Sequence, residues 1–430
     1  MKKTAILGFG MEGKDSLDYF LAKGYSVSIF DKKKKSELDF EGVPESKVGL
    51  FLGKDYDLKF LTNFDSVVRS PGVYRYLPKI VEAEKKGVEI TSAIKIFFSQ
   101  AKGKIIGVTG TKGKGTTASL IYRILKDAGK DVYLAGNIGI PYLSLLPKLK
   151  KNTVVVLEMS SFQLIDMEVS PQISVVLNIT SDHLDWHKDL KEYVEAKKRV
   201  VRFQRPEDYA VINADYETSR SFAAETKAQT VLFSKNKLAA KYKDVLILRG
   251  EHNWENVAAA VSVAKIFKVK DEIILQVLGA FRGLEHRLEL VGEVRGVTFC
   301  NDSFATGPQP TIAAVNSFTE PLTVILGGYD KKLDYGQLGQ VISQKKNVVN
   351  VILLGAVAGK IKQALKGASF AGKMVEMGKP EMAAVVQKAF SLTPKGGVVL
   401  LSPAAASFDM FPNYKERGKK FKEAVLALKQ

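Results

Sequence analysis

Cysteine and histidine are both scarce in this sequence. A single cysteine, Cys300, excludes a disulfide framework and suits a reducing compartment. Four histidines leave little room for a histidine-rich metal cluster. No apolar stretch approaches the roughly 18–20 residues that a membrane-spanning helix needs. Gly8 and Gly10 interrupt the apolar run at the N-terminus, which predicts a buried strand and a turn rather than a signal peptide. These absences favour a cytoplasmic enzyme with no membrane insertion.

Acidic residues are also in deficit. Lysine and arginine together number 64, aspartate and glutamate 46, and the net charge is +18. Such an excess favours anionic partners, which include phosphates, carboxylates and nucleic acids. The run Lys32–Lys35 follows Asp31 and could face phosphates, although a solvated charged surface fits better. The other basic residues are scattered, and no helix-turn-helix or zinc-finger spacing is present. The sequence therefore favours small anionic ligands and no nucleic acid.

Short apolar runs alternate with helical segments along all 430 residues, a length that suggests about three domains. Runs such as Ile105–Val108 and Val398–Leu401 are typical of buried strands in parallel sheets. We predict an α/β protein of three domains: an N-terminal Rossmann-like domain (residues 1–91), a central P-loop ATPase-like parallel sheet (92–284) and a C-terminal Rossmann-like domain (285–430). Glycine-rich turns follow strands at Gly8, Gly110 and Gly327, where ligands of open α/β sheets bind.

The first of these turns, residues 8–13, is a complete G-x-G-x-x-G motif between a predicted strand and a predicted helix. Asp31 ends the next strand at about the distance expected for a ribose contact. The N–H groups at the start of the helix could bind a diphosphate. The motif alone is compatible with NAD, as in a dehydrogenase, or with another nucleotide.

The second turn lies within residues 107–117, which read G-V-T-G-T-K-G-K-G-T-T. Its glycines allow backbone N–H groups to surround phosphates, and Lys114 could reach the β- and γ-phosphate oxygens. The spacing is not a strict Walker A motif, because Val108 and Gly115 occupy two of its fixed positions. Thr116 or Thr117 would then supply the hydroxyl near Mg²⁺.

Polar residues follow the neighbouring strands. Glu158 ends the run Val154–Leu157, a position suited to Mg²⁺, although a solvated carboxylate is the alternative. His183 and His187 lie four residues apart and could be zinc ligands on a helix, but a polar loop near the phosphates fits better because no H-E-x-x-H pattern is present. Asn253 and Asn256 share one helix face and could contact a base or ribose, or simply cap the helix.

Taken in order, these segments resemble the Mur ligase family of peptidoglycan synthesis over the whole chain. The matching segments are T-G-T-K-G-K-G-T-T from Thr109, L-E-M-S-S-F-Q-L from Leu157, Gly250–Asn256, H-R-x-E from His286, N-D-S-x-A-T from Asn301 and L-S-P-A-x-A-S-F-D from Leu401. S-S-F-Q and the last motif resemble the glutamate-adding members and argue against folylpolyglutamate synthases, which share the phosphate-binding loop.

The resemblance implies an ATP-dependent ligase with one domain each for a UDP-sugar, ATP and an amino acid. It implies that ATP phosphorylates the carboxylate of UDP-N-acetylmuramoyl-L-alanine, that the amine of D-glutamate attacks the acyl phosphate, and that two Mg²⁺ ions assist. It assigns the first glycine motif to the UDP group instead of NAD. We expect a monomer.

The resemblance also implies roles for individual residues. The implied catalytic residues are Lys114, Glu158, His183 and Lys197, and the implied metal ligands are Thr116, Glu158, His183 and Lys197, the last as a carbamate. The implied ATP contacts are Gly110, Thr111, Lys112, Gly113, Lys114, Gly115, Thr116, Thr117, Asn253, Asn256, Arg287 and Asp302. The implied sugar-nucleotide contacts are Gly10, Met11, Asp31, Ser70, Gly72, Asn137, Ser160 and Gln163, and those of the amino acid are Thr306, Lys331, Ser407 and Tyr414.

Three positions leave alternatives open. Gly115 stands where the family usually has serine or threonine, which leaves the metal hydroxyl to Thr116. Phe304 replaces the family's usual lysine, so selectivity for D-glutamate is less secure than the ligase activity. Lys197 lies beside Lys198 and Arg199, and spacing alone favours a surface helix lysine over a carbamate.

Overall fold

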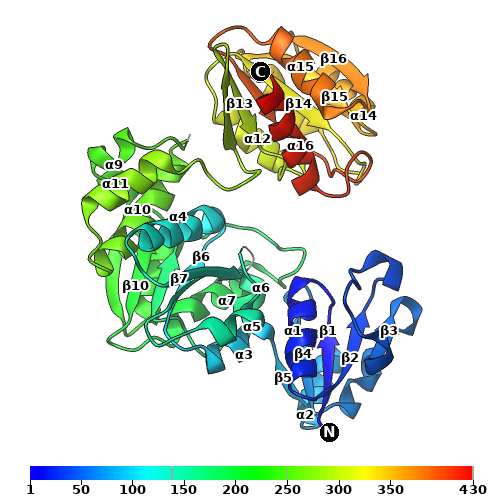
Figure 1. Cartoon of the computed structure of the whole chain (residues 1–430), viewed down its shortest axis with the longest axis vertical. Helices are drawn as coiled ribbons and strands as arrows, with labels where there is room; N and C mark the ends of the chain where they lie inside the picture. The colour runs from blue at the N-terminus through cyan, green and yellow to red at the C-terminus, as the bar shows by residue number, and fades with distance from the viewer. Residues whose placement is uncertain (137–138, 249, 429–430) are drawn as a thin grey trace. The chain divides into compact units, whose positions relative to one another are not determined.

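The computed structural model describes residues 1–136, 139–248 and 250–428 and divides into two compact units. One unit comprises Met1–Leu246 and Glu251–Gly279, and the other comprises Ile247–Gly250 and Ala280–Gln430. The first unit contains an N-terminal and a central sheet, and the second contains a C-terminal sheet (Figure 1). The predicted α/β class is confirmed.

The N-terminal sheet is parallel throughout, with strand order β3-β2-β1-β4-β5. This order matches five of the six strands of the Rossmann order 3-2-1-4-5-6. Its elements are β1 (Lys3–Leu7), α1 (Met11–Ala22), β2 (Ser26–Asp31), β3 (Val48–Leu52), β4 (Ser66–Arg69), α2 (Pro78–Lys85) and β5 (Glu89–Thr91). Ala5 and Leu7 of β1 are fully buried, as expected for a strand with neighbours on both sides.

The central sheet is also parallel, with strand order β11-β10-β9-β6-β8-β7. Its strands are β6 (Lys104–Thr109), β7 (Val132–Gly136), β8 (Val154–Glu158), β9 (Ile173–Val176), β10 (Tyr209–Asn213) and β11 (Gln229–Phe233). Its helices are α3 (Ala93–Gln100), α4 (Lys114–Asp127), α5 (Tyr142–Leu145), α6 (Ser161–Leu164), α7 (Leu190–Arg202), α8 (Glu217–Arg220), α9 (Ala240–Asp244), α10 (His252–Ile266) and α11 (Asp271–Ala280). α4 and α10 pack against each other, and α7 joins a separate core cluster with α3 and α5.

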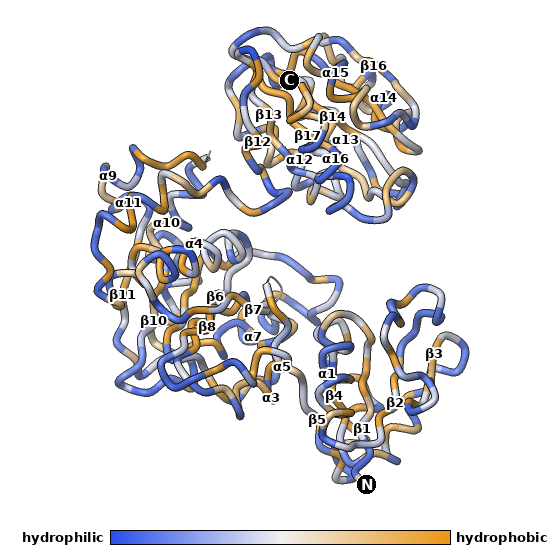
Figure 2. The backbone as a smooth tube through the Cα atoms, in the orientation of Figure 1, coloured by the Kyte–Doolittle hydropathy of each residue, from blue (hydrophilic) through white to orange (hydrophobic). Residues whose placement is uncertain are grey.

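The C-terminal sheet is mixed, with strand order β12-β13-β17-β14-β15-β16, because β12 is antiparallel to β13. Its strands are β12 (Glu289–Val294), β13 (Val297–Asn301), β14 (Leu322–Gly327), β15 (Val348–Leu354), β16 (Lys373–Gly378) and β17 (Val398–Leu401). Its helices are α12 (Pro308–Asn316), α13 (Gly336–Gln344), α14 (Ala358–Gly367), α15 (Met382–Leu392) and α16 (Tyr414–Ala427). In Figure 2 hydrophobic residues concentrate along the inner strands, and hydrophilic residues predominate in the outer loops.

A buried ion network joins the N-terminal sheet to the segment that follows α6. Arg69 at the end of β4 and Arg75 both lie 3.1 Å from the carboxylate oxygens of Asp166. Each partner is almost completely buried, so removing one would leave an uncompensated charge. The network therefore positions the edge of the N-terminal sheet against the central domain. Among the described residues, no helix is long and apolar enough to cross a membrane.

Candidate active site

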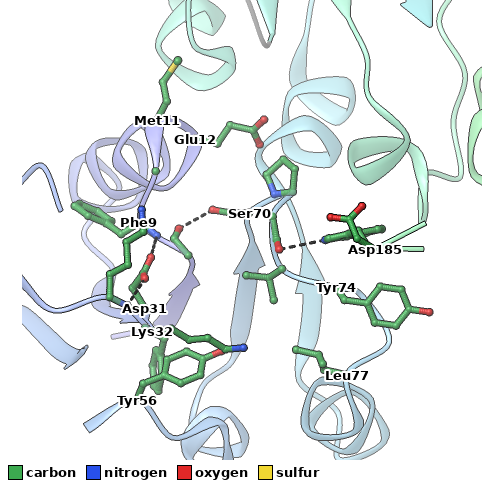
Figure 3. Close-up of a pocket in the computed structure, with 18 of the residues that line it drawn as sticks. Phe9, Met11, Glu12, Asp31, Lys32, Tyr56, Ser70, Tyr74, Leu77 and Asp185 are labelled. Carbon is green, nitrogen blue, oxygen red and sulfur yellow. Dashed lines mark hydrogen bonds between the residues drawn. The ribbon is translucent and has the colours of Figure 1, made fainter. Parts of the chain in front are cut away.

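The first glycine loop, residues 8–13, lies at the carboxyl end of β1 and leads into α1. Gly8 has a positive φ of 90°, and a Cβ atom on Gly13 would lie only 2.4 Å from the Gly8 carbonyl oxygen. Glycine is therefore required for this turn. The loop borders a cavity of about 670 Å³ (Figure 3). Five residues predicted to contact the sugar nucleotide line this cavity, namely Gly10, Met11, Asp31, Ser70 and Gly72.

Two of these residues also shape the loop. Asp31 accepts hydrogen bonds from the backbone N–H groups of Phe9 (2.7 Å) and Lys33 (2.8 Å). The hydroxyl of Ser70 donates to the carbonyl of Gly8 at 2.6 Å. Asp31 thus fixes the glycine loop against the end of β2, a role that the sequence comparison with dinucleotide-binding motifs did not predict.

Sequence reasoning missed several residues around the cavity, among them Tyr56 of the N-terminal domain and Trp186 of the central domain. Lys32 and Lys33, which directly follow β2, also line the cavity. The indole Nε1 of Trp186 donates to the carbonyl of Gly72 at 3.2 Å. Lys32 and Lys33 belong to the basic run that the sequence left open between a phosphate contact and a solvated surface. No spacing pattern in the sequence indicates that Trp186 lies beside Gly72.

The second glycine loop, residues 107–117, connects β6 to α4. Gly113 has a positive φ of 86°, and a Cβ atom there would lie 2.2 Å from Oδ1 of Asn256. The backbone N–H groups of Thr111 and Lys112 donate to Asn178, at 2.6 and 2.9 Å. Nζ of Lys114 lies 3.0 Å from the carbonyl oxygen of Gly110. These contacts give the loop a fixed shape at the carboxyl end of a parallel strand, where phosphate-binding loops occur.

The side chains of this loop contact the polar segment after β9. Lys112 forms an exposed ion pair with Asp182 at 3.1 Å. The hydroxyl of Thr111 lies 2.8 Å from the hydroxyl of Tyr193 and donates to the carbonyl of Thr180 at 3.0 Å. The segment predicted to lie near the phosphates is therefore attached to the second glycine loop.

Gly115, Thr116 and Thr117 are buried in the first turn of α4. The hydroxyl of Thr117 donates to Asn256 at 3.1 Å, and the amide of Asn256 donates to Asn253 at 2.9 Å. Both asparagines lie on one face of α10, as predicted, and connect that helix to the second glycine loop. Because Thr117 already contacts Asn256, Thr116 is the better candidate for a metal-binding hydroxyl.

Lys197 is buried on α7, with only 2% of its surface exposed. Its Nζ atom lies 2.9 Å from the carbonyl oxygen of Gly110 and 4.8 Å from the ring centre of Tyr193. Burial lowers the pKa of Lys197 well below its ordinary value, and the positive charge of Lys114 lowers that pKa further. The alternative of a surface helix lysine is therefore wrong.

Glu158 ends β8 and is half-buried, and His183 has a positive φ of 54° with its ring 4.8 Å from that of Phe162. His187 is buried, 2.8 Å from the hydroxyl of Ser161 and 3.3 Å from Glu192. The two histidines lie in turns before α7 and not on a helix. Within residues 1–136, 139–248 and 250–428, no three His, Cys, Asp or Glu side chains form a group that could hold a metal.

Ser160 and Gln163 cap the short helix α6. The backbone N–H of Gln163 donates to the hydroxyl of Ser160 at 3.3 Å, and the backbone N–H of Ser160 donates to the side chain of Gln163 at 2.8 Å. The Gln163 amide also donates to Glu12 and to the hydroxyl of Tyr142, at 2.7 Å in each case. This network brings α6 to the first turn of α1. Asn137, the other predicted sugar contact in this region, lies outside the described residues.

In the second unit, the guanidinium of Arg287 lies 4.4 Å from the ring centre of Phe304, an arrangement that permits a cation–π interaction. The ring of Tyr414 contacts Phe304 edge-on at 5.2 Å. Phe304 is 42% exposed. An exposed cation, Arg287, therefore lies beside the residue that replaces the family's lysine.

Asp302 is buried and accepts hydrogen bonds from Ser402 (2.7 Å) and from the backbone N–H of Leu288 (3.2 Å). Burial raises the pKa of Asp302 to about 7. Of the predicted amino-acid contacts, Ser407 is buried, Thr306 and Tyr414 are half-buried and Lys331 is exposed.

Three family models match successive parts of the chain. Residues 2–92 match the "Mur ligase MurD-like, N-terminal domain", residues 108–264 the "Mur ligase middle domain" and residues 286–405 the "Mur ligase, glutamate ligase domain". A UDP-N-acetylmuramoylalanine–D-glutamate ligase of Acetivibrio thermocellus is 41% identical, over 99% of this chain and 96% of its own length. Its counterpart in Ruminiclostridium cellulolyticum is 36% identical, over 100% of this chain and 97% of its own length.

Solved structures share the fold at lower identity. UDP-N-acetylmuramate-alanine ligase MurC of Thermotoga maritima has a TM-score of 0.60 at 18% identity and is covered over 99% of both chains. MurF ligase of the same organism, solved in complex with ADP, has a TM-score of 0.55 at 16% identity, over 99% of this chain and 96% of its own. The chain belongs to the Mur ligase family, whose members are ATP-dependent ligases that form amide bonds.

Proposed function

We propose that this chain is the ligase that joins D-glutamate to UDP-N-acetylmuramoyl-L-alanine in peptidoglycan synthesis. The observation that carries the proposal is the 41% identity, over almost the entire chain, to a relative with this name. Further support comes from the two glycine loops, since a ligase of this kind needs separate sites for a sugar nucleotide and for ATP.

The chemistry requires activation of a carboxylate, because a free carboxylate is a poor electrophile. The terminal phosphoryl group of ATP passes to an oxygen of the alanine carboxylate, which gives ADP and an acyl phosphate. The amine of D-glutamate then attacks the carbonyl carbon. The resulting tetrahedral intermediate expels inorganic phosphate, the nitrogen loses a proton, and an amide bond remains. Fixed positive charge must stabilise the phosphoryl group during transfer.

The second glycine loop supplies such charge in the proposal. Lys114 lies in the first turn of α4, where the backbone N–H groups of residues 110–117 can also face phosphate oxygens. Asn253 and Asn256 support the loop from α10, through the contact between Asn256 and Thr117. The family resemblance assigns two further ATP contacts, Arg287 and Asp302, to the second unit.

Two Mg²⁺ ions fit the donors near this loop, because Mg²⁺ prefers oxygen ligands and keeps several waters and phosphate oxygens. Thr116 offers a hydroxyl, Glu158 a carboxylate and His183 an imidazole. Bound Mg²⁺ would neutralise the charge on the transferring phosphoryl group. The small number of acidic side chains at the loop is compatible with ions that take most of their ligands from ATP and water.

Lys197 enters the proposal as a carbamate. A larger fraction of its amine is neutral than in an exposed lysine, because burial and the charge of Lys114 lower its pKa. A neutral amine can add CO₂, lose a proton and become an anionic oxygen ligand. That change would replace a buried positive charge, which metal ions repel, with a negative one.

The cavity beside the first glycine loop is the proposed site of the UDP-sugar. Gly10, Met11, Asp31, Ser70 and Gly72 line it. The proposal extends this site to Asn137, Ser160 and Gln163. The amino acid is assigned to the second unit, at Thr306, Lys331, Ser407 and Tyr414. The three sheets thus correspond to sites for the UDP-sugar, ATP and amino acid, in a monomer that acts in the cytoplasm.

ADP release, measured with each substrate omitted in turn, tests the proposal. We expect full turnover only with ATP, UDP-N-acetylmuramoyl-L-alanine and D-glutamate together. Turnover that does not require the sugar nucleotide would contradict it. The alternative of a dehydrogenase, which the first glycine motif alone allows, predicts instead a thermal shift with NAD.

A further inference from the structure

Glu12 is a poorly solvated carboxyl group between the first glycine loop and the central domain. It is the second residue of α1 and lines the cavity (Figure 3). Oε1 accepts a hydrogen bond from the amide of Gln163 at 2.7 Å. Oε2 is inaccessible to solvent and has no hydrogen-bond partner among the described residues. A buried carboxyl oxygen without a donor is unfavourable in the charged state and is stabilised by a proton.

The charged neighbours of Glu12 do not compensate a negative charge on it. Arg69 of β4 is the cation that lowers the pKa of Glu12, but it already contacts Asp166 at 3.1 Å and the carbonyl of Val73 at 2.9 Å. Asp15, on the same helix, adds a like charge and accepts hydrogen bonds from the backbone N–H groups of Leu143 and Ser144 in α5. Burial, opposed by Gln163 and Arg69, raises the pKa of Glu12 to about 7.

The remaining charged groups around the cavity lie on other elements. Asp31 at the end of β2 is engaged by backbone N–H groups, and Lys32 and Lys33 follow it. Asp185 faces the cavity from the loop before α7. The amide nitrogen of Gln163 that donates to Glu12 also donates to the hydroxyl of Tyr142.

We propose that Glu12 is a neutral acid in the complex with the sugar nucleotide, with its proton on the buried oxygen Oε2, so that no negative charge lies at the start of α1 where the diphosphate binds. This inference rests on the proposed function, which places that substrate in the cavity. A carboxylate beside the anion-binding start of α1 would repel the diphosphate, whereas an uncharged carboxylic acid lets the backbone N–H groups bind it without that repulsion.

The consequence is a dependence of substrate affinity on pH. Bound diphosphate further favours the protonated form of Glu12, so binding above about pH 7 must take up a proton. If only the protonated form binds, affinity falls about tenfold for each pH unit above the pKa of Glu12. A glutamine at this position is uncharged at all pH values and should remove the dependence.

Isothermal titration calorimetry of the full chain with UDP-N-acetylmuramoyl-L-alanine tests this inference. Wild type, Glu12→Gln and the control Asp18→Asn, an exposed acid on the same helix, are compared between about pH 6 and about pH 8.5. Buffers of different ionisation enthalpy give the number of protons taken up. At about pH 8 we expect wild type and Asp18→Asn to take up nearly one proton on binding, and Glu12→Gln to take up nearly one proton fewer than wild type. At the same pH, Glu12→Gln should bind the sugar nucleotide roughly tenfold more tightly than wild type.

Three outcomes would overturn the inference. Equal proton uptake by wild type and Glu12→Gln would mean that Glu12 keeps its ionisation state on binding, for example as an anion that stabilises the start of α1. Weaker binding by Glu12→Gln with an unchanged pH dependence would assign Glu12 only a structural role beside Gln163. If neither wild type nor any variant binds the sugar nucleotide at about pH 6, the proposed function is refuted as well. The first two outcomes refute only the inference about Glu12.

Discussion

Nζ of Lys197 lies 2.9 Å from the carbonyl oxygen of Gly110, so a lysine of α7 contacts the second glycine loop from inside the protein. The lysine is 2% exposed and no carboxylate is within ion-pair distance in the described residues. A buried ammonium with only neutral partners is costly in free energy. A reaction that converts this amine into an anionic metal ligand would explain why the residue is buried here.

Lys197→Ala should reduce the rate of ADP formation at least about 100-fold, by analogy with the loss of one essential electrostatic group. A short carboxylate, acetate or formate, should partly restore the rate because it can occupy the space of the carbamate. The measurement is the ADP-release assay with and without the added carboxylate.

Lys198→Ala is the matched control, because Lys198 forms ion pairs with Glu195 and Glu225 near the surface of the same helix. It should retain near wild-type activity. Full activity of folded Lys197→Ala, or a wild-type mass without a carbamate under CO₂ in native conditions, would refute the carbamate.

Lys114→Ala should abolish ATP turnover, with a loss of about 10²–10³-fold or more in kcat, and leave the fold intact. The ammonium lies in the first turn of α4, where it can neutralise charge on the transferring phosphoryl group. Lys112→Ala is the comparison, since Lys112 is exposed and pairs with Asp182. Circular dichroism checks folding, and near-normal turnover by a folded Lys114→Ala would reject the assignment.

Asn256→Ala should weaken both ATP binding and stability. It removes the acceptor of the Thr117 hydroxyl and the donor to Asn253, and such a buried loss costs about 1–3 kcal/mol. Thermal unfolding with and without ATP measures both effects. An unchanged melting temperature and an unchanged shift with ATP would show that α10 does not support the loop.

Lys331→Ala should mainly raise the KM for D-glutamate, by about 10–100-fold, because a carboxylate needs a cation and Phe304 cannot provide one. Lys332→Ala is the neighbouring control. The same assay with lysine or another basic amino acid tests whether the absence of a cation at position 304 has widened the specificity. An unchanged KM in Lys331→Ala would assign amino-acid binding to another group, with Arg287 beside Phe304 as the next candidate.

Asp302 should make stability depend on pH. Burial raises its pKa to about 7, from an ordinary value of 3.8. The folded state therefore keeps a proton that the unfolded state loses, and this contribution is full below about pH 4 and is lost as pH rises to about 7. Over that range the free energy of unfolding of wild type should fall by about 1.4 kcal/mol per pH unit relative to Asp302→Asn.

Unfolding midpoints of the two proteins between about pH 4.5 and pH 8 provide this measurement. Glu285→Gln is a suitable control, because Glu285 is exposed and its pKa is lowered by Lys422. Parallel pH profiles for wild type and Asp302→Asn would contradict a buried neutral carboxyl.

The strands and the two glycine loops could be predicted from the sequence, because a short apolar run that ends in glycine is typical of a buried strand followed by a tight turn. The burial of Lys197 also left a signal. Tyr193, Ala196, Lys197, Val200 and Val201 are the buried residues of α7, spaced as one face of a helix. The lysine occupies a core position of that pattern, which the adjacent charges at 198 and 199 obscured.

The environment of Glu12 could not be predicted in the same way. Its position in the G-x-G-x-x-G motif accepts any side chain, and an acid in the first turn of a helix is ordinary. Its burial depends on Gln163, which lies 151 residues away in the chain. Likewise, the contact of Trp186 with Gly72 depends on how the loop before α7 folds towards the N-terminal sheet.

The most direct test of the central claim is mass spectrometry of the product formed from ATP, UDP-N-acetylmuramoyl-L-alanine and a mixture of D-glutamate, L-glutamate and neutral and basic amino acids. The account predicts one new sugar nucleotide, which carries a single glutamyl residue derived from the D-isomer, with one ADP and one phosphate formed for each product. Consumption of ATP without a glutamyl product, or a product built from a different amino acid, would contradict it.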